Sequence, residues 1–300
     1  MNFLNKNIIN ELEKYGEVNK DVDLKKYNTF KISSICDYLV IPKNKESLKN
    51  LIKYLKTIKK EFIILGNGSN VIFKNKRTKK VVILLTNLNK ISYDQNIVTA
   101  ESGVKLPILV NDTLNKDLLG LEWAINIPGT VGGSVFGNAG CYGNEINERL
   151  ISVEVLKDNE FKVLNKNELY FSYRDSIFKK EKNMIIISAS FMLEYGSSES
   201  VKEVIKERNI KRKETQPLEY PSAGSVFRNP LGDYAGAIIE KLGFKKFSIN
   251  DAEVSEKHAN FIINKGNATG KDVIKLIKKI QKKAKQEYNI DLILEHIIID

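Results

Sequence analysis

Three short stretches of the sequence place polar side chains in settings that suit catalysis. Arg174 stands among the aromatic residues of segment 170–176, and its planar guanidinium could bind a carboxylate through two hydrogen bonds. Ser225 follows Gly224 in a turn-rich segment with a proline near each end, where its hydroxyl could donate a proton. Glu295 stands between apolar runs, and a carboxylate in such surroundings often has a raised pKa and a function.

Each of these side chains also has a structural interpretation. Arg174 could be a surface residue paired with Asp175, and these residues alone slightly favour that interpretation. Ser225 could bond to the main chain of its own turn, and Glu295 could face solvent on an edge strand. A serine hydrolase is poorly supported, because Ser225 lacks a glycine two residues away on either side and the chain has only two histidines.

Two glycine-rich stretches predict a site for a phosphorylated ligand. Six of the eighteen glycines fall in segment 128–143, and a second glycine turn at 66–70 follows the apolar run 62–65. Glycine lets the main chain approach a ligand, and successive N–H groups form a concave anion site. The alternative is that these glycines only serve turns. The pattern is neither a Rossmann fingerprint nor a P-loop, because Val71 replaces the third glycine and no Gly-Lys-Ser/Thr follows.

The bulk properties indicate a globular protein of about two domains. The net charge is +11, but lysine dominates the basic residues along the whole length, so nucleic-acid binding is not expected. The start of the chain lacks a signal-peptide pattern, and the longest apolar run is too short to span a membrane. Two cysteines without metal-ligand spacing indicate the cytoplasm, and we expect no metal, no membrane partner and a monomer.

The elements that must position these residues predict an α+β fold. A first domain is expected over residues 1–195, with two α+β lobes divided near 55–60, followed by a smaller α+β domain over 196–290 and a closing strand at 291–300. Expected helices lie at 7–15, 45–59, 107–119, about 198–213, 233–242 and 270–288, and expected strands at 38–41, 62–65, 71–73, 81–85, 97–101, 151–156, 161–164, 184–193, 261–264 and 291–300.

Taken in order, six stretches resemble the UDP-N-acetylenolpyruvoylglucosamine reductase family, in particular its shorter subtype. The resemblance implies a FAD-binding domain of the vanillyl-alcohol-oxidase type, followed by a substrate domain with a catalytic carboxylate on the closing strand. An alternative is another FAD-linked dehydrogenase or oxidase of the same fold, and a nucleic-acid-binding protein is a more distant one. The matching stretches are Asn28–Ile32, Gly66–Asn70, Ile127–Gly133 with Asn138–Gly143, Tyr173–Ser176, Ala223–Pro230 and Val254–Phe261.

The resemblance also implies a reaction. NADPH as co-substrate would reduce noncovalently bound FAD, which would reduce the enolpyruvyl group of UDP-N-acetylglucosamine enolpyruvate to give UDP-N-acetylmuramate. This product serves peptidoglycan synthesis and thereby cell wall biogenesis, cell shape and cell division. The implied cofactor-binding residues are Gly66, Asn67, Gly68, Ser69, Asn70, Pro128, Gly129, Gly132, Gly133, Ser134, Asn138 and Gly140.

The resemblance implies three catalytic residues. Ser225 would protonate C2 of the enolpyruvyl group after a hydride reaches C3 from flavin N5, while Arg174 and Glu295 would bind and polarise the substrate carboxylate. The implied substrate-binding residues are Tyr173, Asn229, His258 and, as a phosphate partner, Lys213. From its own surroundings, His258 is expected to be a hydrogen-bonding residue rather than a metal ligand, because no second ligand stands near it.

Overall fold

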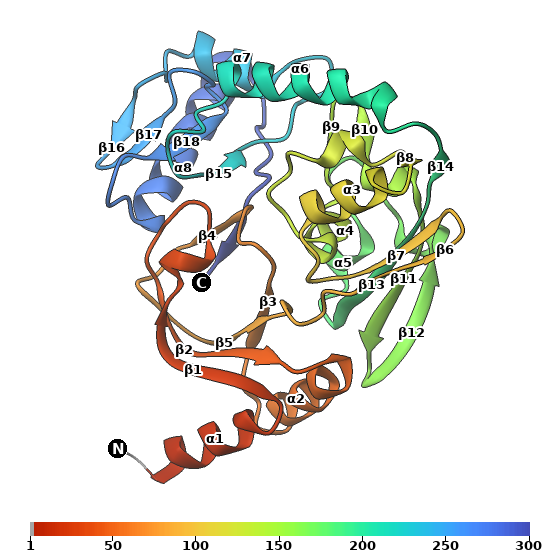
Figure 1. Cartoon of the computed structure of the whole chain (residues 1–300). Coiled ribbons are helices and arrows are strands. Elements are labelled where there is room, and N and C mark those ends of the chain that lie inside the picture. The colour runs from red at the N-terminus through yellow and green to blue at the C-terminus, as the bar shows by residue number, and fades with distance from the viewer. Residues whose placement is uncertain (1–2) are drawn as a thin grey trace. The chain divides into compact units, whose positions relative to one another are not determined.

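The computed structural model of the protein describes residues 3–300, and Figure 1 labels many of its helices and strands. The chain divides into two units. Two early segments of the chain belong to the same unit as its C-terminal part. The domain boundaries expected at residues 195 and 290 stay a prediction. Unit 1 comprises Met1–Val22, Cys36–Asn67 and Lys79–Lys206, and unit 2 comprises Asp23–Ile35, Gly68–Thr78 and Glu207–Asp300.

The first sheet of unit 1 has four strands in the order β1-β2-β5-β3. Leu48, Leu51 and Leu55 of α2 (Lys45–Thr57) recur every three or four residues, so they form one apolar face. This face packs on Val40 and Val81 of the sheet. The strands are β1 (Gly16–Asp23), β2 (Ile35–Pro42), β5 (Arg77–Leu84) and β3 (Phe62–Leu65), and α1 (Phe3–Glu13) precedes them.

The second sheet of unit 1 is antiparallel and has five strands in the order β12-β11-β13-β7-β6. Val110 of α3 (Leu106–Leu114) and Val135 of α4 (Val131–Gly137) belong to one core with Phe191 of the sheet. The chain passes from one sheet to the other between Leu84 and Ile91, and the lobe division expected near 55–60 stays a prediction. The strands are β12 (Glu160–Asn165), β11 (Leu150–Lys157), β13 (Met184–Met192), β7 (Ile97–Glu101) and β6 (Ile91–Asp94).

Unit 2 contains a second antiparallel sheet with the order β15-β18-β17-β16. The long helix α8 (Gly270–Tyr288) begins at a capping box of Thr269 and Asp272 and buries Leu276 and Ile280. A separate parallel pair joins β4 (Val71–Phe73) to β19 (Ile297–Ile299), at opposite ends of the sequence. The remaining elements include β15 (Ser222–Ser225), β18 (Phe261–Asn264), β17 (Ala252–Val254), β16 (Ser248–Ile249) and α7 (Ala235–Lys241).

Two sequence predictions of secondary structure were wrong. The helix expected at 107–119 ends at Leu114, because Asp117 adopts φ 54° and the chain turns into β8 (Leu118–Leu119), which pairs with β14 (Glu194–Tyr195). The strand expected at 291–300 is continuous only over Ile297–Ile299, because the chain first bridges Phe227 and then changes partner. The glycine-rich segment 128–143, for which no helix was expected, contains α4. Further elements are α5 (Ile177–Lys180), α6 (Glu199–Thr215), β9 (Gly140–Cys141) and β10 (Asn144–Glu145).

Candidate active site

The two glycine-rich stretches touch each other within unit 1. Asn67 donates a hydrogen bond from Nδ2 to the carbonyl oxygen of Pro128 at 2.7 Å. A Cβ on Gly66 would lie 2.8 Å from Oγ1 of Thr130, a hydroxyl that accepts a bond from the N–H of Gly133 and thereby caps α4. The absence of a side chain at residue 66 therefore lets the two turns meet. Gly66, Asn67 and Gly133 are exposed at this meeting point.

The second stretch is held against the strand end at Ser102. A Cβ on Gly132 would lie 2.8 Å from the Cβ of Ser102, and the N–H of Gly132 donates to the Ser102 oxygen at 2.9 Å. The hydroxyl of Ser134 is buried and has no hydrogen-bond partner in the part of the chain that the structure describes. A buried hydroxyl without a partner is costly, so Ser134 is a candidate contact for a bound group.

Gly68 has a different role from Gly66. It adopts φ 61°, and a Cβ there would lie 2.1 Å from the carbonyl oxygen of Tyr27 and 2.7 Å from the Cα of Asn28. Thr29 in turn donates its N–H to the Gly68 oxygen at 3.1 Å. The segments 28–32 and 66–70, noted separately in the sequence, therefore cross at Gly68, and only glycine fits that crossing.

Asn70 connects the first glycine turn to the strand of Glu295. Its Nδ2 donates to the Glu295 carbonyl oxygen at 3.2 Å, and its own carbonyl accepts from the N–H of Ile297 at 3.0 Å. The side chain of Asn70, predicted to bind a cofactor, is therefore engaged with the main chain of Glu295 in unit 2. Ser69, its neighbour, is partly buried.

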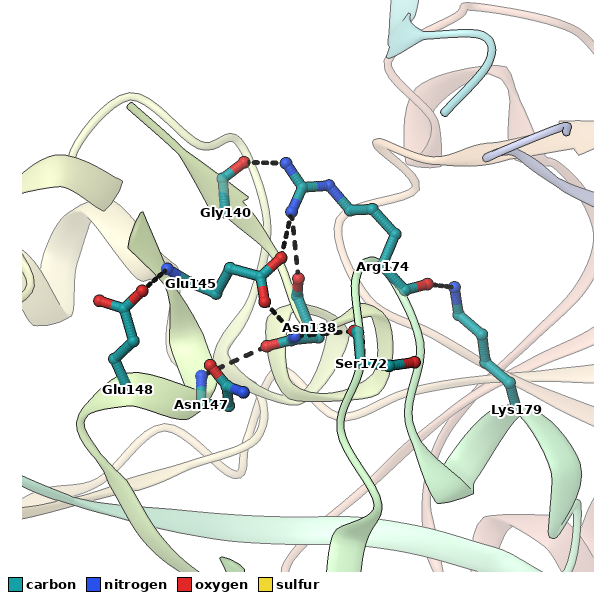
Figure 2. A network of polar contacts seen from close by, with 8 residues as sticks. All are labelled: Asn138, Gly140, Glu145, Asn147, Glu148, Ser172, Arg174 and Lys179. Atoms are coloured by element: carbon teal, nitrogen blue, oxygen red, sulfur yellow. Dashed lines mark hydrogen bonds and ion pairs between the residues drawn. The ribbon is translucent and has the colours of Figure 1, made fainter. Parts of the chain in front are cut away.

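Arg174 lies at the centre of a polar network in unit 1 (Figure 2). Its Nη1 pairs with Oε1 of Glu145 at 3.0 Å, its Nη2 donates to the carbonyl oxygen of Gly140, and Lys179 donates to the Arg174 carbonyl. Arg174 also adopts φ 55°, a conformation that non-glycine residues rarely take and that surrounding contacts must hold. A Cβ on Gly140 would lie 2.9 Å from Nη1, so this glycine makes room for the guanidinium.

Asn138 fixes the carboxylate of Glu145, which in turn pairs with Arg174. It is fully buried, and its Nδ2 donates to Oε2 of Glu145 at 2.7 Å and to the carbonyl of Ser172 at 2.9 Å, while its Oδ1 accepts from the N–H of Asn147 (Figure 2). Asn138 and Gly140, both predicted to bind the cofactor, therefore support Arg174. The favoured pairing of Arg174 with Asp175 is not the one observed, because the hairpin β9–β10 brings Glu145 to the guanidinium.

Ser225 ends β15 in unit 2, opposite Phe261 of β18. The residues that follow are fixed by Asn260, whose Oδ1 accepts from the N–H of Phe227 at 3.0 Å and whose Nδ2 donates to the Phe227 carbonyl at 2.8 Å. Glu295 lies beside this segment, because its N–H donates to the Val226 carbonyl at 2.9 Å. Unit 2 therefore brings the main chains of Ser225 and Glu295 together, whereas Arg174 belongs to unit 1.

Two predicted substrate contacts meet at the start of α7. Oδ1 of Asn229 accepts from the N–H of Ala235 at 3.1 Å, and the His258 ring lies 3.4 Å from where a Cβ on Gly236 would be. His258 accepts at Nδ1 from the N–H of Asn260, and burial lowers the pKa of its imidazole. The ring is therefore neutral near pH 7, which lets Nδ1 accept this hydrogen bond.

The other two predicted substrate contacts lie elsewhere. The ring of Tyr173, about half exposed, lies 4.9 Å from the guanidinium carbon of Arg174. Lys213 is exposed in the last turn of α6, and its carbonyl accepts from Nζ of Lys257 at 3.3 Å.

Sequence reasoning missed Glu145, Asn260 and Thr130. Glu145 and Asn260 act through interactions with residues distant in sequence, and Thr130 meets Gly66 across the two turns, so spacing along the chain carries little signal for these contacts. Within residues 3–300 no group of three or more His, Cys, Asp or Glu side chains could hold a metal ion. Over the same described residues, no helix is long and apolar enough to cross a membrane.

The fold and the site define a FAD-dependent flavoprotein. A family model described as "FAD binding domain" matches residues 36–160. A solved structure of Phl p 4.0202, a glucose dehydrogenase, shares the fold at a TM-score of 0.51, with 13% identity over 63% of this chain and 44% of that chain. The predicted fold class, an α+β FAD-binding domain of the vanillyl-alcohol-oxidase type followed by a smaller α+β domain, is confirmed.

The chain belongs to the UDP-N-acetylenolpyruvoylglucosamine reductase family. The model of that family's C-terminal domain matches residues 216–299. A reductase of this name from Caldanaerobacter subterraneus subsp. tengcongensis is 42% identical over 97% of this chain and 96% of its own length. One from Clostridium novyi is 41% identical over 99% and 96%. The crystal structure of the Thermus caldophilus reductase gives a TM-score of 0.82 at 32% identity, covering 95% of this chain and all of that chain.

Proposed function

We propose that this chain catalyses the FAD-dependent reduction of UDP-N-acetylenolpyruvoylglucosamine in peptidoglycan precursor synthesis, with NADPH as the reductant. The observation that carries the proposal is its similarity to reductases of this name over nearly its whole length. Arg174, Ser225 and Glu295 are all present for the reaction that such an enzyme performs. A cytoplasmic location and a monomeric state remain proposals that rest on the sequence alone.

The glycine-rich stretches suit the diphosphate of FAD. Gly66, Asn67 and Gly133 expose main chain where the two turns meet, and the Ser134 hydroxyl has no protein partner among the described residues. Main-chain N–H groups and hydroxyls bind phosphate oxygens in such concave sites. FAD held there would supply hydride-transfer chemistry between NADPH and C3 of the enolpyruvyl group. The residues proposed to hold it are Gly66, Asn67, Gly68, Ser69, Asn70, Pro128, Gly129, Gly132, Gly133 and Ser134.

Within this set we propose different roles for side-chain and main-chain atoms. The amides of Asn67 and Asn70 are bonded to Pro128 and Glu295, so their contribution to FAD binding is assigned to main-chain atoms. Asn138 and Gly140 contribute by holding Arg174 beside the second stretch. Covalent attachment of the flavin through a histidine would need that residue at the cofactor site. Neither histidine of the chain lies in a glycine-rich stretch, which supports noncovalent binding.

Arg174 is proposed to bind the substrate carboxylate. Glu145 and the Gly140 carbonyl hold its guanidinium in one orientation before substrate arrives. A donor that is already oriented loses less conformational entropy on binding, so more of the interaction energy remains for affinity. Tyr173, which stacks on the guanidinium, extends this surface toward the substrate. Positive charge here would stabilise the enolate character that develops when C3 receives a hydride.

Ser225 is proposed to complete the reduction. Its hydroxyl proton would pass to C2, forming the second new C–H bond, and the serine would regain a proton from solvent. A serine hydroxyl is a weak acid, so the transfer works only when C2 is strongly basic, as after hydride arrival at C3. Glu295, fixed next to the chain that follows Ser225, is proposed to act with Arg174 on the substrate carboxylate. Asn229, His258 and Lys213 are proposed to contact the rest of the substrate.

The experiment that tests this function is product analysis. The purified protein with NADPH and UDP-N-acetylglucosamine enolpyruvate should form UDP-N-acetylmuramate, which is two hydrogens heavier than the substrate. A panel of sugars and hydroxy acids should leave the flavin oxidised. Reduction of the flavin by one of these alcohols, with the enolpyruvyl compound unchanged, would instead identify a dehydrogenase or oxidase of the same fold.

A further inference from the structure

A bulge in β15 determines which way Ser225 points. Ser222 pairs with Ile263, but the next pairing joins Ser225 to Phe261, so three steps on β15 oppose two steps on β18. In an unbroken antiparallel ladder Gly224 would stand opposite Phe261. Because side chains alternate between the faces of a strand, the extra residue places Ser225 on the face that Gly224 would otherwise occupy. Gly224 makes the bulge possible by adopting φ 81°.

His296 contacts the main chain of this bulge. Its Nε2 lies 3.0 Å from the carbonyl oxygen of Ala223, inside the bulge. The ring is 5% exposed, so this bond is shielded from water. Because a carbonyl can only accept, Nε2 carries the proton, and Nδ1 is buried without a partner among residues 3–300. The bond to Ala223 therefore fixes the ring, together with edge-to-face packing on Phe30 at 6.3 Å.

His296 and its neighbour Glu295 form hydrogen bonds to the main chain on both sides of Ser225. His296 bonds the carbonyl two residues before Ser225, and the N–H of Glu295 bonds the Val226 carbonyl directly after it. Burial also lowers the pKa of His296 to about 4, so the ring stays neutral and keeps this geometry near pH 7. An aliphatic side chain could fill the same space but would leave the Ala223 carbonyl without a donor.

We propose that His296 is a positioning residue for the reduction, which keeps the β15 bulge in the register that aims the Ser225 hydroxyl at the substrate. The inference rests on the proposed function of Ser225. A displacement of a reacting group by about 1 Å can slow a reaction roughly 100-fold, so a bond that fixes the bulge is sufficient to matter.

The test compares His296→Gln with His296→Asn. The glutamine amide nitrogen can occupy the place of Nε2 and donate to Ala223, whereas the shorter asparagine amide cannot reach it. Stopped-flow absorbance of the flavin measures its reduction by NADPH and its reoxidation by UDP-N-acetylglucosamine enolpyruvate separately. We expect both variants to be reduced within about twofold of wild type, His296→Gln to be reoxidised within about threefold, and His296→Asn to be reoxidised about 10- to 100-fold more slowly.

A double variant separates this role from a general structural one. With Ser225→Ala in place, His296→Asn should slow reoxidation by no more than about twofold further, because the hydroxyl to be aimed is gone. Equal reoxidation rates of His296→Asn and His296→Gln would overturn the inference and leave the proposed function intact, provided that Ser225→Ala is slow. Fast reoxidation of Ser225→Ala would overturn both. If His296→Asn does not retain flavin, His296→Gln decides alone: wild-type reoxidation supports the inference, and slow reoxidation overturns it.

Discussion

Asn70 donates a hydrogen bond to the main-chain oxygen of Glu295 at 3.2 Å, across 225 positions of the sequence. The bond lies where β4 and β19 begin their parallel pairing, and Ile297 completes it by donating to the Asn70 carbonyl. A turn identified for its glycines therefore also fixes the strand of a proposed catalytic carboxylate. The first residues of the turn contact the second glycine stretch, and its last residue holds Glu295.

Replacing Asn70 with aspartate should destabilise the protein. The variant keeps the shape of the side chain but replaces the donor at Nδ2 with a second acceptor, which faces the Glu295 carbonyl. Loss of one partly buried hydrogen bond, with one acceptor left facing another, costs about 1–3 kcal/mol. Urea unfolding followed by circular dichroism measures this. Ser69→Ala is the matched control in the same turn, and an equal loss in both variants would contradict the role given to Asn70.

Replacing Asn138 with glycine should weaken substrate binding. Glycine tolerates the φ of 46° at this position, so the change removes the amide without adding backbone strain. Glu145 then loses the donor at its Oε2, and the guanidinium of Arg174 loses a fixed partner. We expect KM for the enolpyruvyl substrate to rise about tenfold, which corresponds to about 1.4 kcal/mol. An unchanged KM with lost flavin would show that Asn138 serves the cofactor instead.

Two glycines of α4 should respond differently to substitution by alanine. A Cβ on Gly132 would lie 2.8 Å from the Cβ of Ser102, whereas nothing lies within 4 Å of a Cβ on Gly137. Gly132→Ala should therefore push α4 away from residue 102 and raise the dissociation constant of FAD about tenfold or more. Gly137→Ala should leave it unchanged and add about 0.5–1 kcal/mol of stability, because alanine favours helix. Fluorescence titration with FAD measures both constants.

How far the sequence predicted the fold depended on the apolar pattern of each element. Strands at 62–65 and 261–264 and the helix at 270–288 were confirmed to the residue, because continuous or periodic apolar residues define them. β1 was missed because its sequence, Gly-Glu-Val-Asn-Lys-Asp-Val-Asp, is mostly polar. Its place in the sheet depends on its pairing with β2, which spacing within the segment does not encode.

The residues of the candidate site also differ in how well the sequence predicted them. Arg174, Ser225 and Glu295 stand in short stretches whose residue types suggest chemistry, and the family resemblance gave them catalytic roles before the fold was known. Glu145 and His296 could not be predicted in this way, because one becomes important only when the β9–β10 hairpin reaches Arg174 and the other only when β15 bulges. Asn138 was noted for its position among glycines, and its contact with the cofactor stays a prediction. Its side chain is buried in the Arg174 network, a role that the sequence did not suggest.

Acid should destabilise the protein through His296. Its pKa falls from 6.5 to about 4 on folding, so between these values the unfolded chain binds a proton that the folded chain does not. The contribution is fully present above pH 6.5 and is lost as the pH falls toward 4, by about 3 kcal/mol in total. His258, whose pKa burial also lowers, acts in the same direction. Urea unfolding from pH 4 to 7 should therefore show a shallower pH dependence in His296→Gln, and an unchanged slope would contradict the account of His296.

The central proposal is that this chain reduces the enolpyruvyl group with NADPH as the reductant and FAD as the cofactor, and that Ser225 supplies the proton. Anaerobic stopped-flow absorbance of the holoenzyme tests it most directly. NADPH should bleach the flavin band in wild type and in Ser225→Ala alike, and UDP-N-acetylglucosamine enolpyruvate should restore it rapidly in wild type but at least about 100-fold more slowly in Ser225→Ala, the size expected for loss of a general acid. A protein without a flavin band, or a reduced flavin that the enolpyruvyl substrate does not reoxidise, would contradict the claim.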